Sequence, residues 1–123
     1  MFQRISSVRP TTLIIVADGP RDGDEESGRR CSAARKVVES VDWPCEVHRD
    51  YASKHLGLRT RLEAGFDFAF SIVERAIFIE DDCLPEPTFF RYVEELLDFY
   101  ENDHRIACIS GYKPPGVLVD GAS

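Results

Sequence analysis

The apolar positions of the chain form short continuous runs that are separated by longer stretches with helical spacing. One run covers residues 13–17 and ends at Asp18, and a weaker one covers residues 45–49. Two more runs cover residues 75–80 and lie within residues 105–112. Short apolar runs bounded by turn residues are typical of strands that are buried in a sheet. The pattern therefore predicts four strands in these places.

Between and after these runs, apolar residues recur at intervals of three and four, which is the spacing of one helix face. The first predicted helix begins near Arg29, and its apolar stripe is Cys31, Ala34, Val37, Val38 and Val41. The second covers the stripe Leu58, Leu62, Phe66, Ala69, Phe70 and Val73. The third begins near Pro87, a position that the first turn of a helix tolerates, and has the stripe Phe89, Val93, Leu96, Leu97 and Tyr100. Helical spacing also relates Phe2, Ile5 and Val8.

The regular alternation of strands and helices predicts an α/β fold with three αβα layers and a mostly parallel, Rossmann-like sheet. We expect residues 1–123 to form a single partial domain in which residues 114–123 are a disordered tail. In such sheets, ligands bind outside the carboxyl ends of the strands. Asp18 and the acidic triplet at residues 80–82 both fall at that edge.

The formal net charge of −7 argues against a nucleic acid as partner, because proteins that bind nucleic acids present basic patches. No apolar stretch approaches the ~20 residues of a membrane span, and the first residues do not resemble a signal peptide. The four cysteines lack the spacing of a zinc site. We therefore expect reduced thiols in a cytoplasmic protein.

The triplet Glu80, Asp81 and Asp82 is the strongest candidate for chemistry. Side chains alternate along a strand, so Glu80 and Asp82 are expected to point to one side and Asp81 to the other. Their oxygen atoms suit Mg²⁺ or Mn²⁺, which would bridge this acidic chain to a diphosphate. Two simpler interpretations stay open: the triplet is a solvated loop, and Asp18 with Gly19 is only a turn.

Four stretches of the sequence resemble the N-terminal half of a GT-A-fold glycosyltransferase of the nucleotide-diphospho-sugar transferase superfamily. They are LIIVADGPR, HLGLRTRLEAGFDFAF, FIEDDCLPEPTFFRYVEELLDFY and RIACISGY, and together they extend over about residues 10–113. The most specific is the stretch that contains E-D-D, a form of the D-x-D motif. The resemblance implies a nucleotide-sugar donor that is bound through a divalent metal, Mn²⁺ or Mg²⁺.

The resemblance also implies roles for individual residues. Asp82 matches the carboxylate that binds the metal of the donor diphosphate, and Glu80 and Asp81 match its neighbours, which contact the ribose and the sugar or shape the metal site. Asp18 matches an acid that helps to hold the nucleoside.

Gly57 and Arg59 match the segment that approaches the base and the phosphate. Where family members often carry Asn, this sequence has His55.

Two departures from the family pattern bear on activity. Only nine residues precede Pro10, where the family's first strand and helix are expected, so residues 2–8 correspond to the end of that helix. Few residues follow the last stretch, where the acceptor half and its catalytic base are expected, and Asp120 is the only acid there. We therefore expect a fragment that keeps part of the donor-binding half and is inactive by itself.

Two other functions stay open on the sequence alone: a non-catalytic remnant that binds nucleotide or metal, and a receiver-type signalling domain. A receiver domain needs a Lys after a late strand, which Lys113 would supply, but it also needs an acid pair after the first strand, which is missing. The absence of the family's first strand further predicts open strand edges near residues 13 and 77. We expect these two strands to pair directly or the chain to self-associate through them.

Overall fold

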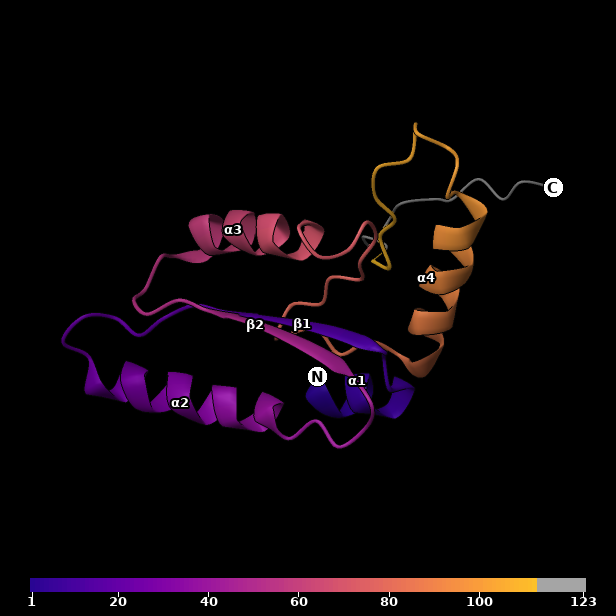
Figure 1. Cartoon of the computed structure of the whole chain (residues 1–123). Coiled ribbons are helices and arrows are strands. Elements are labelled where there is room, and N and C mark those ends of the chain that lie inside the picture. Colours follow the sequence, from indigo (N-terminus) through magenta and orange to yellow (C-terminus); the bar gives the residue numbers. More distant parts are fainter. Residues whose placement is uncertain (113–123) are drawn as a thin grey trace. The chain divides into compact units, whose positions relative to one another are not determined.

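The computed structural model describes residues 1–112 of the chain, and this part contains four helices and a two-stranded parallel sheet (Figure 1). In chain order the elements are α1 (Phe2–Val8), β1 (Thr12–Ala17), α2 (Glu25–Glu39), β2 (Glu46–Tyr51), α3 (Leu58–Phe70) and α4 (Pro87–Phe99). The expected α/β class is therefore confirmed. Within the described residues, no helix has the length and apolar character that crossing a bilayer requires.

The chain divides into two compact units. The first, Met1–Leu84, contains both strands and the helices α1, α2 and α3, and the second begins at Pro85 and contains α4. That residues 1–123 form one domain stays a prediction, and the proposed tail at residues 114–123 lies outside the described residues.

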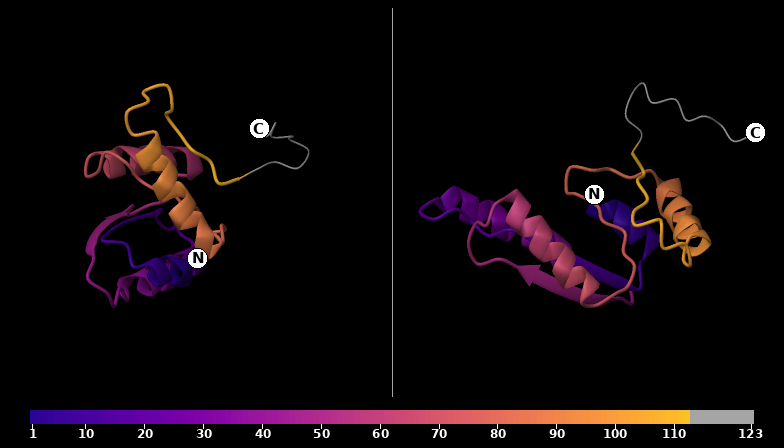
Figure 2. Two further views of the ribbon diagram at one scale, coloured as in Figure 1. Left: turned by 90° about the vertical axis from the view of Figure 1, so that its right-hand side faces the viewer. Right: turned by 90° about the horizontal axis from the view of Figure 1, so that it is seen from above.

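The sheet of the first unit is a parallel pair whose register joins Thr12 to Glu46 and Ala17 to Tyr51. Parallel strands need a crossover connection, and α2 supplies it. The Asp24 side chain begins this helix by accepting a hydrogen bond of 2.9 Å from the Ser27 amide, which satisfies one of the orphan donors of the first turn. In Figures 1 and 2, α3 lies on one side of the strand pair, and α1 and α2 lie on the other.

The strands predicted for residues 75–80 and 105–112 do not form, so both predictions are wrong within the described part. Residues 76–80 run without a hydrogen-bonded neighbouring strand and end in a turn, where the Cys83 amide donates to the Glu80 carbonyl over 3.1 Å. An apolar run becomes a strand only when another backbone accepts and donates its ladder bonds. The direct pairing expected between the segments near residues 13 and 77 is absent for the same reason.

The buried face of α3 also differs from the prediction. Leu58, Leu62, Phe66 and Phe70 of the predicted stripe are exposed, while its other two members, Ala69 and Val73, are buried and partly buried. Arg61 and Gly65, which the stripe did not include, are buried. Small residues at Gly65 and Ala69 let the helix approach β1 closely, because an added Cβ at Gly65 would lie 2.9 Å from a Val16 methyl group. The larger residues instead face outward, where the Phe66 ring meets the Phe78 ring at 4.6 Å.

The apolar stripe predicted for α2 is correct at three of its five positions. Cys31, Val38 and Val41 are partly buried, but Ala34 and Val37 are exposed, and Arg35 takes a place on the inner face. At the other end of the strands, buried Trp43 donates its indole N–H to the Pro10 carbonyl over 2.9 Å, with the Phe2 ring 6.1 Å away. Trp43 therefore connects α1 and the residues after it to the start of the strands. The helix expected for residues 2–8 is confirmed as α1.

The helix of the second unit matches the sequence pattern. It begins at Pro87, as predicted, and every residue of its predicted stripe is buried or partly buried. Phe90 joins that stripe and is buried together with Val93.

Replacing either of two helical glycines by alanine is expected to change the free energy of unfolding differently. An added Cβ at Gly28 in α2 meets nothing within 4 Å, so Gly28→Ala is expected to stabilise the protein by roughly 0.5–1 kcal/mol, the ordinary helix propensity of alanine. At Gly65 the contact with Val16 offsets that gain, so Gly65→Ala should be neutral or destabilising. Urea denaturation of both variants measures the difference, and an equal gain at both positions would contradict close packing of α3 on β1.

Candidate functional site

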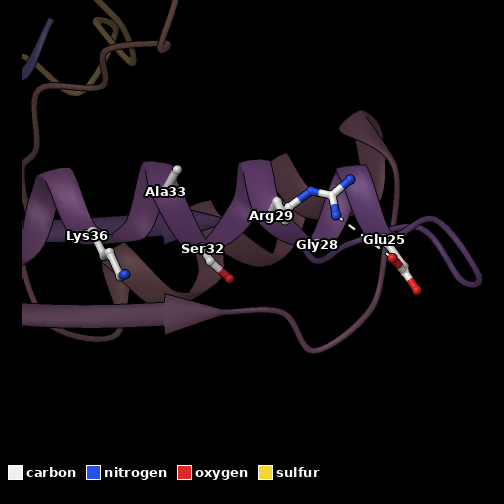
Figure 3. Close-up of a pocket in the computed structure, with 6 residues that line it drawn as sticks. All are labelled: Glu25, Gly28, Arg29, Ser32, Ala33 and Lys36. Carbon is white, nitrogen blue, oxygen red and sulfur yellow. Dashed lines mark ion pairs between the residues drawn. The ribbon is translucent and has the colours of Figure 1, made fainter.

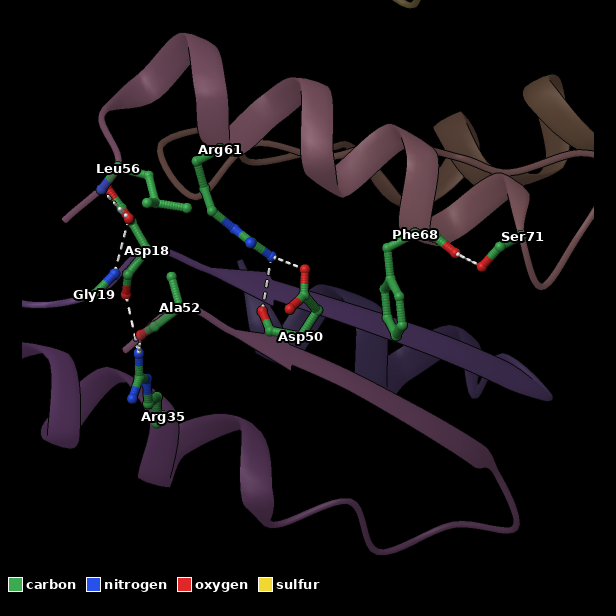
Figure 4. A network of polar contacts seen from close by, with 9 residues as sticks. All are labelled: Asp18, Gly19, Arg35, Asp50, Ala52, Leu56, Arg61, Phe68 and Ser71. Carbon is green, nitrogen blue, oxygen red and sulfur yellow. Dashed lines mark hydrogen bonds and ion pairs between the residues drawn. The ribbon is translucent and has the colours of Figure 1, made fainter. Parts of the chain in front are cut away.

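Asp18 lies directly after β1 and organises the loop that leads into α3 (Figure 4). Its Oδ1 accepts hydrogen bonds from the amides of Gly19 at 2.8 Å and Leu56 at 2.9 Å, and its Oδ2 accepts one from the Gly57 amide at 3.1 Å. His55 Nδ1 lies 2.7 Å from the same Oδ2. Asp18 is thus more than a local turn residue, because it ties the end of β1 to residues almost forty positions later.

These contacts act on the ionisation of Asp18. Partial burial by itself raises the pKa of a carboxyl group, but the amides of Leu56, Gly19 and Gly57 oppose this, and nearby His55 adds to their effect. The pKa of Asp18 is lowered below its ordinary value as a net result. The carboxylate is therefore charged at neutral pH and acts as an acceptor rather than as an acid.

The structure brings Gly57 to Asp18 but leaves Arg59 at the surface. Gly57 precedes α3 with a positive φ of 82°, a conformation that glycine adopts without strain, and this turns its amide toward Asp18. Arg59 lies in the first turn of α3, where its side chain is 91% exposed and pairs with Glu63 at 2.9 Å. An exposed pair of this kind exchanges easily with solvent, which leaves Arg59 accessible to an anion.

Two arginines that the sequence interpretation did not single out hold the carboxyl ends of the strands from opposite sides (Figure 4). Arg35 of α2 donates to the carbonyl oxygens of Asp18 at 3.1 Å and Ala52 at 2.8 Å. Arg61 of α3 donates to the Asp50 carbonyl at 2.8 Å and forms an ion pair with the Asp50 carboxylate.

Of these two arginines, only Arg61 could have been recognised from the sequence. It precedes Gly65 and Ala69 at intervals of four, so it belongs to the face whose small residues permit close packing. His55 stood out in the sequence only as a departure from the family pattern, and its contact with Asp18, which is distant in the sequence, is seen only in the structure.

The acidic triplet is displayed on an exposed turn. Glu80, Asp81 and Asp82 are all exposed, and the Cys83 thiol lies 3.7 Å from an Asp82 oxygen. Because residues 76–80 are not a strand, the alternation that was expected to align Glu80 with Asp82 does not apply. No hydrogen bond or ion pair of the described residues joins the triplet to Asp18 or Gly57.

A divalent metal at this turn is compatible with the chemistry of its donors. In residues 1–112, no three side chains of His, Cys, Asp and Glu are gathered closely enough to enclose a metal ion. Mg²⁺, however, is usually held by one or two carboxylates together with waters and substrate phosphates rather than by a complete protein cage. The exposed Asp82 carboxylate satisfies that smaller requirement.

A separate hollow lies along α2 (Figure 3). It is lined by Glu25, Gly28, Arg29, Ser32, Ala33 and Lys36. All of these residues belong to α2, so the described structure supplies no second wall against which a ligand would be enclosed. Two candidate regions therefore remain, the junction around Asp18 and the acidic turn.

The chain was compared with protein families, with curated proteins and with solved structures, and none of the three comparisons finds a match.

Proposed function

We propose that the chain is a glycosyltransferase-like domain that binds a nucleotide-sugar donor through a divalent metal. The observation that carries the proposal is the junction of Asp18 with the amides of Leu56 and Gly57. It joins the carboxyl end of a parallel strand to the start of a helix, which is where ligands of α/β sheets bind. In this proposal, the strand pair and its helices belong to a three-layer, Rossmann-like GT-A fold.

Asp18 contributes mainly by ordering this junction. Its oxygens already accept three amide hydrogen bonds, so it fixes residues 55–57 in place for a nucleoside to pack against. Arg59, exposed one turn into α3, supplies positive charge for a phosphate. The start of a helix favours an anion for the additional reason that its first amides point outward.

Asp82 would hold the metal, with Glu80 and Asp81 beside it to contact the ribose and the sugar or to shape the metal site. When bound, a divalent cation stabilises the negative charge of a diphosphate leaving group. In a chain with a net charge of −7, this cation also offsets the repulsion between the protein and its anionic ligand.

The test is isothermal titration of the full chain with UDP and with GDP, each in the presence and absence of Mn²⁺. We expect weak binding that requires Mn²⁺ and that Asp82→Asn abolishes, because the amide retains the shape of the side chain but loses the charge. Glu74→Gln is the matched control, since Glu74 is another exposed acid of the same unit, and it should bind as the wild type does.

Three results would overturn parts of this proposal. Binding that survives EDTA, or that is equal in Asp82→Asn and the wild type, removes the metal role of Asp82. Absence of binding with either nucleotide removes the donor-binding function itself.

A further inference from the structure

The outer edge of β1 has backbone groups that lack a partner in the described structure. The Glu46 amide donates to the Thr11 carbonyl over 2.8 Å, and the Ala52 amide donates to the Ala17 carbonyl over 3.0 Å. Parallel strands use alternate residues for each neighbour, so the odd-numbered residues of β1 bond to β2. The N–H and C=O groups of Thr12, Ile14 and Val16 therefore point away from β2, where residues 1–112 provide no second strand.

The two edges of this small sheet differ in the residues that discourage pairing with another strand. β2 has the sequence EVHRDY, and charges of this kind discourage pairing with another strand. β1 has the sequence TLIIVA, which contains no charge, proline or glycine and is rich in β-branched residues. A two-stranded sheet is only marginally stable by itself, and the uncharged edge of β1 is the side at which another strand would extend it.

The edge is continuous with an exposed apolar surface on α3. Val16 lies under Gly65, and the next residue along the helix is Phe66, which packs with Phe70 around Phe78. Phe66, Phe70 and Phe78 are 41%, 54% and 46% exposed as whole residues, so much of their surface still faces solvent. Clusters of exposed aromatic residues are a feature that interaction sites share.

We propose that β1 pairs with β1 of a second copy of this chain, antiparallel about a two-fold axis near Ile14. Such an interface is self-complementary: Ile14 lies opposite Ile14, and Thr12 lies opposite Val16, so the cross-strand pairs are β-branched. The chain has a net charge of −7, and two copies repel wherever charged surfaces meet. The side chains of β1 and of the three phenylalanines carry no charge, so pairing along β1 does not by itself bring like charges together. The inference goes beyond nucleotide binding and does not depend on it.

The experiment is sedimentation velocity of the full chain over a range of concentrations, and the wild type should reach twice the monomer mass of 13.9 kDa. Ile14→Pro removes the outward N–H but leaves the hydrogen bonds to β2 intact, a placement that edge strands tolerate. It should weaken dimerisation by about tenfold or more, since the N–H is lost from both copies. Ile14→Ala is the matched control, because it shortens the side chain but keeps the N–H, and it should remain more strongly associated than Ile14→Pro.

The opposite edge provides a second control. By the same alternation, the N–H of Arg49 points outward from β2, so Arg49→Pro should leave dimerisation unchanged. Hydrogen exchange gives a reading that does not depend on a variant: the amides of Thr12, Ile14 and Val16 should become protected as the wild-type concentration rises. A wild type that stays monomeric at every concentration, or a dimer that Arg49→Pro disrupts and Ile14→Pro does not, would overturn the proposal.

Discussion

Arg61→Ala is expected to destabilise the protein by about 3 kcal/mol, the largest effect of a single substitution that we predict. The Arg61 side chain is only 9% exposed and joins α3 to both the carbonyl and the carboxylate of Asp50. Alanine would leave this carboxylate without its counter-ion at a partly buried position and would open a cavity beneath the helix. The midpoint of urea denaturation measures the loss.

The chain contains a matched control for this substitution two positions away. Arg59 lies on the same helix and also has a carboxylate partner, but its side chain is 91% exposed. Arg59→Ala should therefore change the free energy of unfolding by less than about 0.5 kcal/mol. Similar losses at the two positions would mean that burial of the Arg61 pair does not determine its contribution.

A double variant separates the ion pair from packing. If Arg61 acts mainly through Asp50, then Arg61→Met combined with Asp50→Ala should cost clearly less than Arg61→Ala, because no unpaired charge remains and Met fills the space. An equal or greater loss would assign the role of Arg61 to its hydrogen bond with the Asp50 carbonyl instead.

Asp18→Asn is expected to cost about 2 kcal/mol at neutral pH. The amide keeps one acceptor oxygen but places an NH₂ group among backbone donors, and the negative charge beside His55 is lost. Urea denaturation measures the difference between the variant and the wild type. Asp22→Asn, an exposed acid in the loop that follows, should have little effect.

The effect of Asp18 should depend on pH with a definite sign. Its pKa is lowered in the folded protein from an ordinary value of 3.8, so the folded state favours the charged form. The resulting stability is fully present above that ordinary value and is lost as the pH falls through the lowered pKa of the folded state. The gap between wild type and Asp18→Asn should therefore close under strongly acidic conditions, and a gap that is unchanged there would contradict the role of the charge.

Nucleotide binding and self-association are proposed for different parts of the chain, so separate variants test them. Asp82→Asn alters an exposed turn outside β1, so it tests the metal without touching the strand edge. Ile14→Pro alters the edge without touching Asp18 or Asp82. Comparing both variants in both assays shows whether the two properties are coupled.

The sequence by itself determined the elements whose signals are local. The apolar run before Asp18 predicted β1, the weaker run after Trp43 predicted β2, and Pro87 marked the start of α4. These features depend on neighbours within a few residues, through side-chain spacing, capping and backbone preference. Asp18 was also recognised as a candidate because a carboxylate at the end of a parallel strand is a local pattern.

Only the tertiary structure decided which surfaces are buried and which apolar runs become strands. Residues 76–80 have the composition of a strand, but ladder bonds must come from another segment, and within the described residues none supplies them. The sequence pattern assigned the bulky residues of α3, together with Ala69, to the core, whereas close contact between Gly65 and Val16 buries the face that carries Arg61, Gly65 and Ala69. The long-range partners of Asp18 likewise come from residues 55–57, and contacts between residues so far apart in the chain leave no periodic trace in the sequence.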